Sequence, residues 1–142
     1  MIVKNIMTSG VKTVHVNSTV QDAARIMNEL KIGSLIVMDK DRLMGIITER
    51  DILAGIVEKA KDSSKVLVKE IMTPNVIVVE SDMKIDQAVE LMNDKGIKKL
   101  PVVEKGNLIG IVTAVDIANA QPKLVKKIAD LMHIHKKKII AG

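Results

Sequence analysis

The sequence predicts a mixed α/β (α+β) fold in which two pseudo-symmetric β-α-β-β-α motifs pack through their sheets into one module. Three observations predict this fold: an internal repeat, paired short apolar runs typical of strands, and apolar stripes at helical spacing. The repeat is the strongest of them. Ile6-Met7-Thr8 recurs as Ile71-Met72-Thr73, and the same shift of 65 residues carries Asp51 onto Asp116 without a gap.

The first strand of each copy is expected at Val11 to Val16 and at Val76 to Val79. A helix then follows Ser18, whose spacing to Gln21 fits a capping box, and Asp82 is the equivalent cap in the second copy. The two helices carry apolar stripes, namely Val20, Ala23, Ala24, Met27 and Leu30 in the first copy and Ile85, Ala88, Val89 and Met92 in the second.

Each copy continues with two apolar runs joined by a polar turn, which predicts a hairpin. The runs are Leu35 to Met38 with Leu43 to Ile47, and Leu100 to Val103 with Leu108 to Val112. The last helix of the first copy begins near Thr48 and fades into a polar linker. We therefore divide the chain into a first motif at 1–60, a second motif at 61–121, and a C-terminal helix with a basic tail at 122–142.

Composition narrows the function classes. The chain has 142 residues, 47% of them hydrophobic, with no cysteine and no Phe, Tyr or Trp. Disulfides, thiol nucleophiles and thiolate metal sites are thereby excluded, and no base can stack on an aromatic ring. The formal charge of +5 is a mild bias toward anionic partners. Because there is no leader and no apolar run near the roughly 20 residues of a membrane span, we expect a cytoplasmic protein.

Three features together resemble CBS motifs: the Ile-Met-Thr openings, the Leu100-Pro101-Val102-Val103 strand, and the Gly-apolar-apolar-Thr-x-x-Asp turns at Gly45 to Asp51 and Gly110 to Asp116. The resemblance covers about residues 3 to 120. It implies a stand-alone tandem CBS pair, or Bateman module, with two clefts that bind AMP, ADP, ATP or S-adenosylmethionine. It also implies a homodimer and regulation of a separate partner protein.

The Thr-x-x-Asp turns are the candidate sites. A carboxylate can accept hydrogen bonds from both hydroxyls of a ribose, so Asp51 and Asp116 are the expected ribose ligands. Thr48 and Thr113 stand at the start of a helix, where a hydroxyl and free amides suit a phosphate. The same pattern is also a capping box, with Thr as N-cap and an acid at N3. Both interpretations can hold at once. The glycine that begins each turn would let the backbone run close to a ligand or turn tightly.

The resemblance assigns the turn of one motif and the strands of the other to each cleft. The ligand-binding residues of cleft A are then Ile46, Thr48, Arg50, Asp51, Val76, Ile77, Lys98, Lys99 and Pro101. Those of cleft B are Val11, Lys12, Gly33, Ser34, Ile111, Thr113 and Asp116. The three cationic side chains, those of Arg50, Lys98 and Lys99, favour phosphorylated ligands in cleft A. Cleft B is expected to stay empty or to take a less negative adenosine derivative, and Ile36 replaces proline there. Aliphatic side chains would hold the adenine.

Two other classes of function are weighed against the nucleotide sensor. The tail carries Lys136 to Lys138, which suits a nucleic-acid backbone or a protein partner, and this is the alternative to the nucleotide sensor. An enzyme is not expected, because the sequence shows no Ser-His-Asp set, no Cys-His pair and no Walker-type loop. His133 and His135 lack a further plausible ligand nearby, so no metal site is expected.

Overall fold

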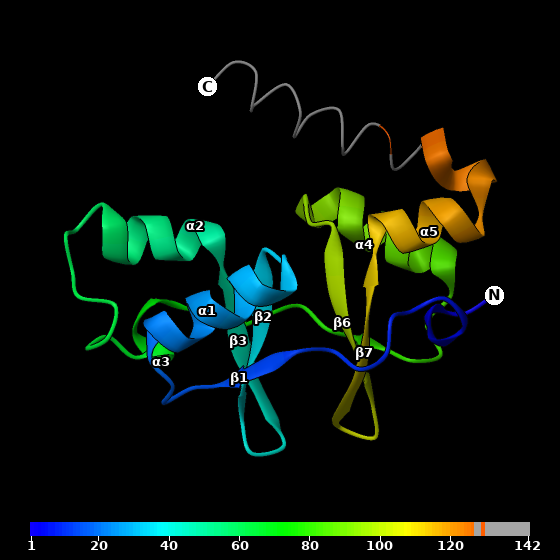
Figure 1. The fold of residues 1–142 in the computed structure, drawn as a ribbon. Coiled ribbons are helices and arrows are strands. Elements are labelled where there is room, and N and C mark those ends of the chain that lie inside the picture. Colours follow the sequence, from blue (N-terminus) through cyan, green and yellow to red (C-terminus); the bar gives the residue numbers. More distant parts are fainter. Residues whose placement is uncertain (127–128, 130–142) are drawn as a thin grey trace. The chain divides into compact units, whose positions relative to one another are not determined.

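The structure is a computed structural model that describes residues 1–126 and 129 and shows a mixed α/β fold (Figure 1). The chain forms two compact units. Unit 1 combines Met1–Val11 with the chain from Ile77 onward, and unit 2 is Lys12–Val76. The predicted boundary near residue 60 separates the sequence repeats, whereas the packed units are separated at residues 11 and 76.

Unit 2 holds a four-stranded sheet in the order β1-β2-β3-β4. Its elements are β1 (Thr13–His15), α1 (Val20–Leu30), β2 (Ser34–Asp39), β3 (Arg42–Thr48), α2 (Glu49–Ile52), the π-helical turn η2 (Leu53–Val57), α3 (Val68–Ile71) and β4 (Thr73–Pro74). Strand β1 runs parallel to β2, and the β2–β3 and β3–β4 pairs are antiparallel. The predicted hairpin of the first copy is confirmed.

Unit 1 repeats this arrangement with a three-stranded sheet in the order β5-β6-β7. Its elements are the 3₁₀ turn η1 (Val3–Asn5), β5 (Val79–Glu80), α4 (Ile85–Lys95), β6 (Lys99–Glu104), β7 (Asn107–Thr113), α5 (Ala114–Ala120) and the 3₁₀ turn η3 (Pro122–Leu124). Strand β5 is parallel to β6, and β6 is antiparallel to β7. Figure 1 shows both hairpins, β2 with β3 and β6 with β7, as long twisted ribbons.

The helices bury most of their predicted stripes. All four predicted residues of α4 are buried, and so are Val20, Ala23 and Met27 of α1. Leu30 is an exception, because it is 44% exposed at the end of α1. Both predicted caps were wrong by one or two residues. The cap of α1 is Thr19, whose hydroxyl oxygen accepts the Asp22 amide at 3.1 Å, and the N-cap position of α4 is Lys84, without a side-chain cap.

The opening segment of each copy packs with the body of the other copy. In unit 1 the Val3 amide donates to the Met83 carbonyl at 2.8 Å, and Thr8 exchanges backbone hydrogen bonds of 2.9 and 3.0 Å with Ile111. In unit 2 the repeat-related Val68 donates to Ser18 at 2.8 Å, and β4 pairs with β3. Val3 and Val68 are fully buried in the cores of their units. Each sheet is therefore completed by a segment that lies far away in the sequence.

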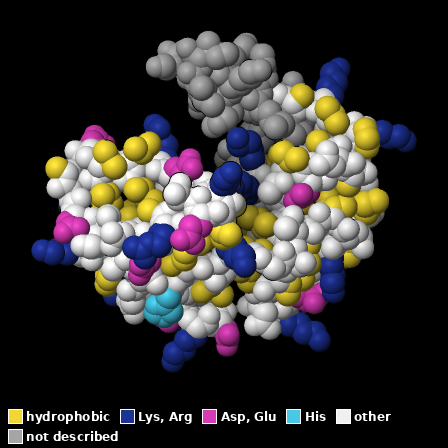
Figure 2. Space-filling view, viewed as in Figure 1, with side chains coloured by type: hydrophobic (Ala, Val, Ile, Leu, Met, Phe, Trp, Pro, Cys, Tyr) yellow, Lys and Arg dark blue, Asp and Glu magenta, His cyan; other side chains and the backbone are white. Residues whose placement is uncertain are grey.

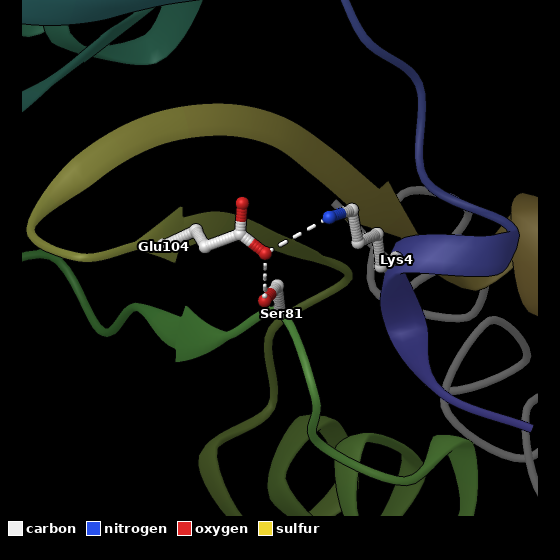
Figure 3. A network of polar contacts seen from close by, with 3 residues as sticks. All are labelled: Lys4, Ser81 and Glu104. Carbon is white, nitrogen blue, oxygen red and sulfur yellow. Dashed lines mark hydrogen bonds and ion pairs between the residues drawn. The ribbon is translucent and has the colours of Figure 1, made fainter.

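A polar network fixes the first opening segment in unit 1 (Figure 3). The Lys4 Nζ atom lies 2.9 Å from Glu104 Oε1, and the buried Ser81 hydroxyl donates to the same oxygen at 2.9 Å. These hydrogen bonds, first from Lys4 and then from Ser81, hold the pKa of the Glu104 carboxyl below its ordinary value. In unit 2 the residue related to Glu104 is Asp39, which instead lies 3.6 Å from His15 Nε2. The network belongs to one copy only.

Candidate functional site

The first candidate turn joins β3 to α2. Thr48 is in extended conformation, with φ −119° and ψ 165°, and its Oγ1 accepts the Asp51 amide at 3.1 Å. Asp51 Oδ2 accepts the Thr48 amide in return, at 2.9 Å. These two hydrogen bonds are a complete capping box, which satisfies two amides that the helix leaves unpaired. The cap interpretation of this turn is confirmed.

The second turn, between β7 and α5, has the same geometry. Thr113 has φ −117° and ψ 162°, its Oγ1 accepts the Asp116 amide at 3.1 Å, and Asp116 Oδ2 accepts the Thr113 amide at 2.9 Å. Both carboxylates are half-buried. Because the cap uses Oδ2, each carboxylate keeps Oδ1 outside the box. The cap thus fixes the side chain without consuming all of its acceptor sites.

The two carboxylates differ in one further contact. The Thr73 hydroxyl, on β4, lies 3.2 Å from Asp51 Oδ1 and 3.4 Å from Asp51 Oδ2. Thr8 holds the equivalent place beside the Asp116 turn. It forms a β-bridge with Ile111, just as Thr73 pairs with Ile46 beside the Asp51 turn. Within residues 1–126, no side chain donates a corresponding bond to Asp116. We did not identify Thr73 as a site residue from the sequence, although its place in the repeated Ile-Met-Thr opening was a signal.

The glycine of each turn makes room for an opening segment. A Cβ placed on Gly45 would lie 2.5 Å from the Thr73 carbonyl oxygen, and one on Gly110 would lie 2.5 Å from Met7 Sδ and 2.9 Å from the Thr8 carbonyl oxygen. These distances are too short for any side chain. The sequence suggested that this glycine lets the backbone run close to a ligand or turn tightly, whereas the close approach seen here is that of the Met-Thr opening segment.

Strand pairing brings other predicted residues next to each turn. Ser34 is the register partner of Thr48, and the Gly33 carbonyl accepts the Glu49 amide at 3.0 Å. In unit 1 the related partner of Thr113 is Lys99. The Lys98 carbonyl accepts the Ala114 amide at 2.9 Å. In the backbone, the two lysines therefore adjoin the Asp116 turn.

Each predicted cleft draws residues from both units. Of the cleft A residues, unit 2 holds Ile46, Thr48, Arg50, Asp51 and Val76, and unit 1 holds Ile77, Lys98, Lys99 and Pro101. Of the cleft B residues, unit 1 holds Val11, Ile111, Thr113 and Asp116, and unit 2 holds Lys12, Gly33 and Ser34. The structure brings together the residues of each turn with their neighbours in the same unit. The grouping into two clefts stays a prediction.

A groove of about 600 Å³ between α1 and α2 was not anticipated from the sequence. It is lined by Ala24, Met27, Asn28, Lys31, Ile32, Glu49, Ile52 and Leu53. Leu53 is 55% exposed, and in Figure 2 hydrophobic side chains reach the surface over these two helices. The groove lies in unit 2 on its own and contains neither Asp51 nor Thr48.

Other expectations fall partly outside the described residues. Among residues 1–126 and 129, no group of three or more His, Cys, Asp or Glu side chains could hold a metal ion. No helix in that part of the chain is long and apolar enough to cross a membrane. The predicted C-terminal helix is described only at its start. His133, His135 and Lys136 to Lys138 lie outside the described residues.

Comparison with known proteins gives consistent matches. The CBS domain model matches residues 3–58 and again 68–123. An uncharacterized protein of Methanopyrus kandleri is 45% identical over 116 residues, which are 80% of this chain and 59% of the relative, so the chain spans about three fifths of that protein. A conserved CBS domain protein from Thermoplasma acidophilum superposes with a TM-score of 0.81 at 30% identity, covering 96% of this chain and 76% of that one. A hexameric CBS-CP12 protein from bloom-forming cyanobacteria gives 0.73 at 28% identity, covering 99% and 83%.

Proposed function

Because the chain belongs to the CBS-domain family and carries two CBS domains, we propose that it is a regulatory sensor that binds an adenosine-type ligand at its two Thr-x-x-Asp turns. The ligand class is AMP, ADP, ATP or S-adenosylmethionine. CBS pairs in general are regulatory ligand-binding modules. The adenosine class is the further step: the family resemblance implies it, and the chemistry of the two aspartates supports its ribose part.

The observation that carries the proposal is the geometry of the two carboxylates. In each turn one oxygen is fixed by a backbone amide at 2.9 Å, and the side chain is half-buried. A carboxylate held in one orientation loses little further freedom when it accepts the two hydroxyls of a ribose. Two charge-assisted hydrogen bonds to a cis-diol would then distinguish ribose from groups that lack one hydroxyl.

The remaining ligand contacts follow from composition. The protein has no aromatic side chain, so the adenine would be held by aliphatic contacts such as those of Ile46, Val76 and Ile77. Ribose and phosphate contacts would then supply much of the affinity, and micromolar dissociation constants are expected. The lysines beside Thr113 and the arginine beside Asp51 are the proposed phosphate contacts.

We further propose binding without turnover. General acid–base catalysis needs a titratable group within hydrogen-bond reach of the reacting atom and of a positioned partner. Each aspartate instead accepts bonds from backbone amides, and Asp51 also accepts one from a hydroxyl. These bonds hold each carboxylate in one orientation, which suits a binding group.

Regulation requires a partner, either a second copy or a separate protein. A hexameric CBS-CP12 protein with the same fold shows that CBS proteins assemble into oligomers, and we propose a homo-oligomer, in the simplest case a homodimer, for this chain. Coupling would arise where the ligand binds two arrangements of the assembly with different affinity.

Calorimetric titration tests the proposal. AMP, ADP, ATP and S-adenosylmethionine, with GMP as the control for base, would be titrated into the wild type and into Asp51→Asn and Asp116→Asn variants. Asparagine keeps a cap acceptor and removes the charge, so the fold is preserved while ribose binding weakens. Saturable adenine-selective binding that falls in at least one variant is expected. Failure of all four ligands to bind the wild type would refute the proposal.

A further inference from the structure

We infer that Thr73 is a specificity-determining residue that competes with the ligand for Asp51, so that the Asp116 turn fills first. This inference rests on the proposed function, because it concerns the same carboxylates. It begins from a polar contact of the Asp51 turn that the Asp116 turn does not make within residues 1–126.

The position of the Thr73 hydroxyl is the first step. It lies 3.2 Å from Asp51 Oδ1 and 3.4 Å from Asp51 Oδ2. A donor at nearly equal distance from both oxygens lies close to the plane that bisects the carboxylate. A ribose diol that binds in bidentate fashion is centred on the same plane, because it donates one hydroxyl to each oxygen. The diol and the Thr73 hydroxyl therefore compete for the same two oxygens.

The acceptor sites of the two carboxylates are unequal as a result. Asp51 accepts the Thr48 amide on Oδ2 and the Thr73 hydroxyl across both oxygens. Asp116 accepts the Thr113 amide on Oδ2, and nothing else in the described part of the chain donates to it. A ligand at Asp51 must displace the Thr73 hydrogen bond, whereas no such bond from residues 1–126 stands in its way at Asp116.

The backbone explains why Thr73 stays in place. It is held in β4 by pairing with β3, where Ile46 is its register partner and Gly45 is the partner of Pro74. A Cβ on Gly45 would collide with the Thr73 carbonyl oxygen at 2.5 Å, so the absence of a side chain there permits the approach. Thr8 is held in the same way against Ile111 but makes no bond to Asp116. The two threonines are thus a matched pair within one chain.

This order of filling is opposite to the one that the charges alone suggest. The family resemblance assigns Arg50, Lys98 and Lys99 to cleft A with Asp51, which favours a phosphorylated ligand there, although the backbones of the two lysines adjoin the Asp116 turn. Competition for the carboxylate acts on the ribose instead. The two effects can be measured apart, because Thr73 carries no charge.

The experiment isolates the Asp51 turn in an Asp116→Asn background and titrates it with AMP. Thr73→Val removes the hydroxyl at nearly constant shape, and AMP affinity is expected to rise about five- to tenfold, the value of one net hydrogen bond. Where Asp116→Asn alone shows no AMP binding, Thr73→Val must restore it. Thr8→Val is the matched control and Thr73→Ser keeps the hydroxyl, so neither is expected to change the affinity.

Two further measurements make the outcomes distinct. In an Asp51→Asn background, Thr73→Val is expected to leave AMP binding unchanged, because the group it competes for is altered. Thermal unfolding of every variant reports whether the fold is kept. Unchanged or weaker AMP binding by folded Asp116→Asn/Thr73→Val protein would overturn the inference while the proposed function stands. Failure of the wild type to bind any adenine ligand would overturn both.

Discussion

Replacing Gly45 by alanine is expected to destabilise unit 2 by disturbing the β3–β4 pair. The new Cβ would lie 2.5 Å from the Thr73 carbonyl oxygen, 3.3 Å from the Thr73 carbonyl carbon and 3.0 Å from Met72 Sδ. The methionine side chain can move, but the carbonyl belongs to the backbone of a paired strand. The strand must therefore withdraw by several tenths of an ångström, which weakens the Gly45–Pro74 and Ile46–Thr73 pairing.

The size of the effect is set by two opposing contributions. Overpacking of this kind costs about 1–3 kcal/mol. Alanine also restricts the unfolded chain, which returns about 0.4–1 kcal/mol where the native φ is not positive. Gly45 has no positive φ. The net loss in the free energy of unfolding is then about 1–2 kcal/mol, which lowers the melting temperature by about 2–8 °C for a domain of this size.

Urea and thermal unfolding followed by circular dichroism measure this loss, with two alanine variants as controls. A Cβ on Gly33 would lie 3.5 Å from the Glu49 side chain, an ordinary contact, so Gly33→Ala is expected to be neutral or slightly stabilising. Gly110→Ala should be intermediate, because its shortest contact, 2.5 Å, is to the movable Met7 sulfur and its backbone contact, to the Thr8 carbonyl oxygen, is 2.9 Å rather than 2.5 Å. Equal stability of Gly45→Ala and Gly33→Ala would refute the explanation of the repeated glycine.

Three further predictions concern contacts that stabilise each unit from within. Val68 is fully buried, so Val68→Ala is expected to lower the free energy of unfolding in urea by about 2 kcal/mol. A loss no larger than that of a surface substitution would show that the second opening segment is not part of a core. The Glu104 carboxylate, whose pKa is lowered by Lys4, contributes stability that is present above its ordinary value of 4.5 and is lost as the pH falls through the lowered value. Glu104→Gln should therefore flatten the acid limb of a melting-temperature profile, and an unchanged limb would argue against the network. Thr19→Ala should cost about 1 kcal/mol through loss of the α1 cap, with little effect of Ser18→Ala; the reverse order in thermal unfolding would contradict the assigned cap.

The sequence predicted the hairpins and the turns well because these features are local. Alternating apolar runs with a short polar turn, such as Leu35 to Ile47, leave few alternatives to an antiparallel pair. The Thr-x-x-Asp spacing likewise brings the side chain of each of Thr48 and Asp51 within hydrogen-bond reach of the other residue's backbone amide across one helical turn. A contact between residues three positions apart can be read from spacing alone.

The exchange of the opening segments could not be predicted in this way. The repeat shows that Ile6-Met7-Thr8 and Ile71-Met72-Thr73 occupy equivalent places, but it does not show which copy each one packs against. Pairing of Thr8 with Ile111 joins residues more than one hundred positions apart. Such a choice depends on the path of the linker and on the tertiary packing of both units, which no local pattern records.

The helix caps were misplaced for a different reason. Ser18 and Thr19 are neighbours with similar capping chemistry, and the choice between them is made by the backbone. The Ser18 carbonyl accepts the Val68 amide at 2.8 Å. The amide of Val20, the first residue of α1, donates to the Val66 carbonyl at 2.9 Å. These tertiary bonds hold the chain so that the Thr19 hydroxyl meets the Asp22 amide.

The contact between Thr73 and Asp51 depends on the packing of each opening segment against the other copy. It therefore could not be predicted from sequence spacing. Both threonines of the repeat stand beside a turn, but only one donates to the aspartate there. Pattern analysis treats the two copies as equal, whereas the structure makes their carboxylates chemically different.

Calorimetric titration of AMP into the wild type and into the Asp51→Asn/Asp116→Asn double variant tests whether the two carboxylates bind the ligand. Saturable binding to the wild type and at least a tenfold loss of affinity in the double variant are expected, with both proteins folded by circular dichroism. Equal AMP affinity in the two proteins would contradict this expectation, because the two carboxylates would then be helix caps alone.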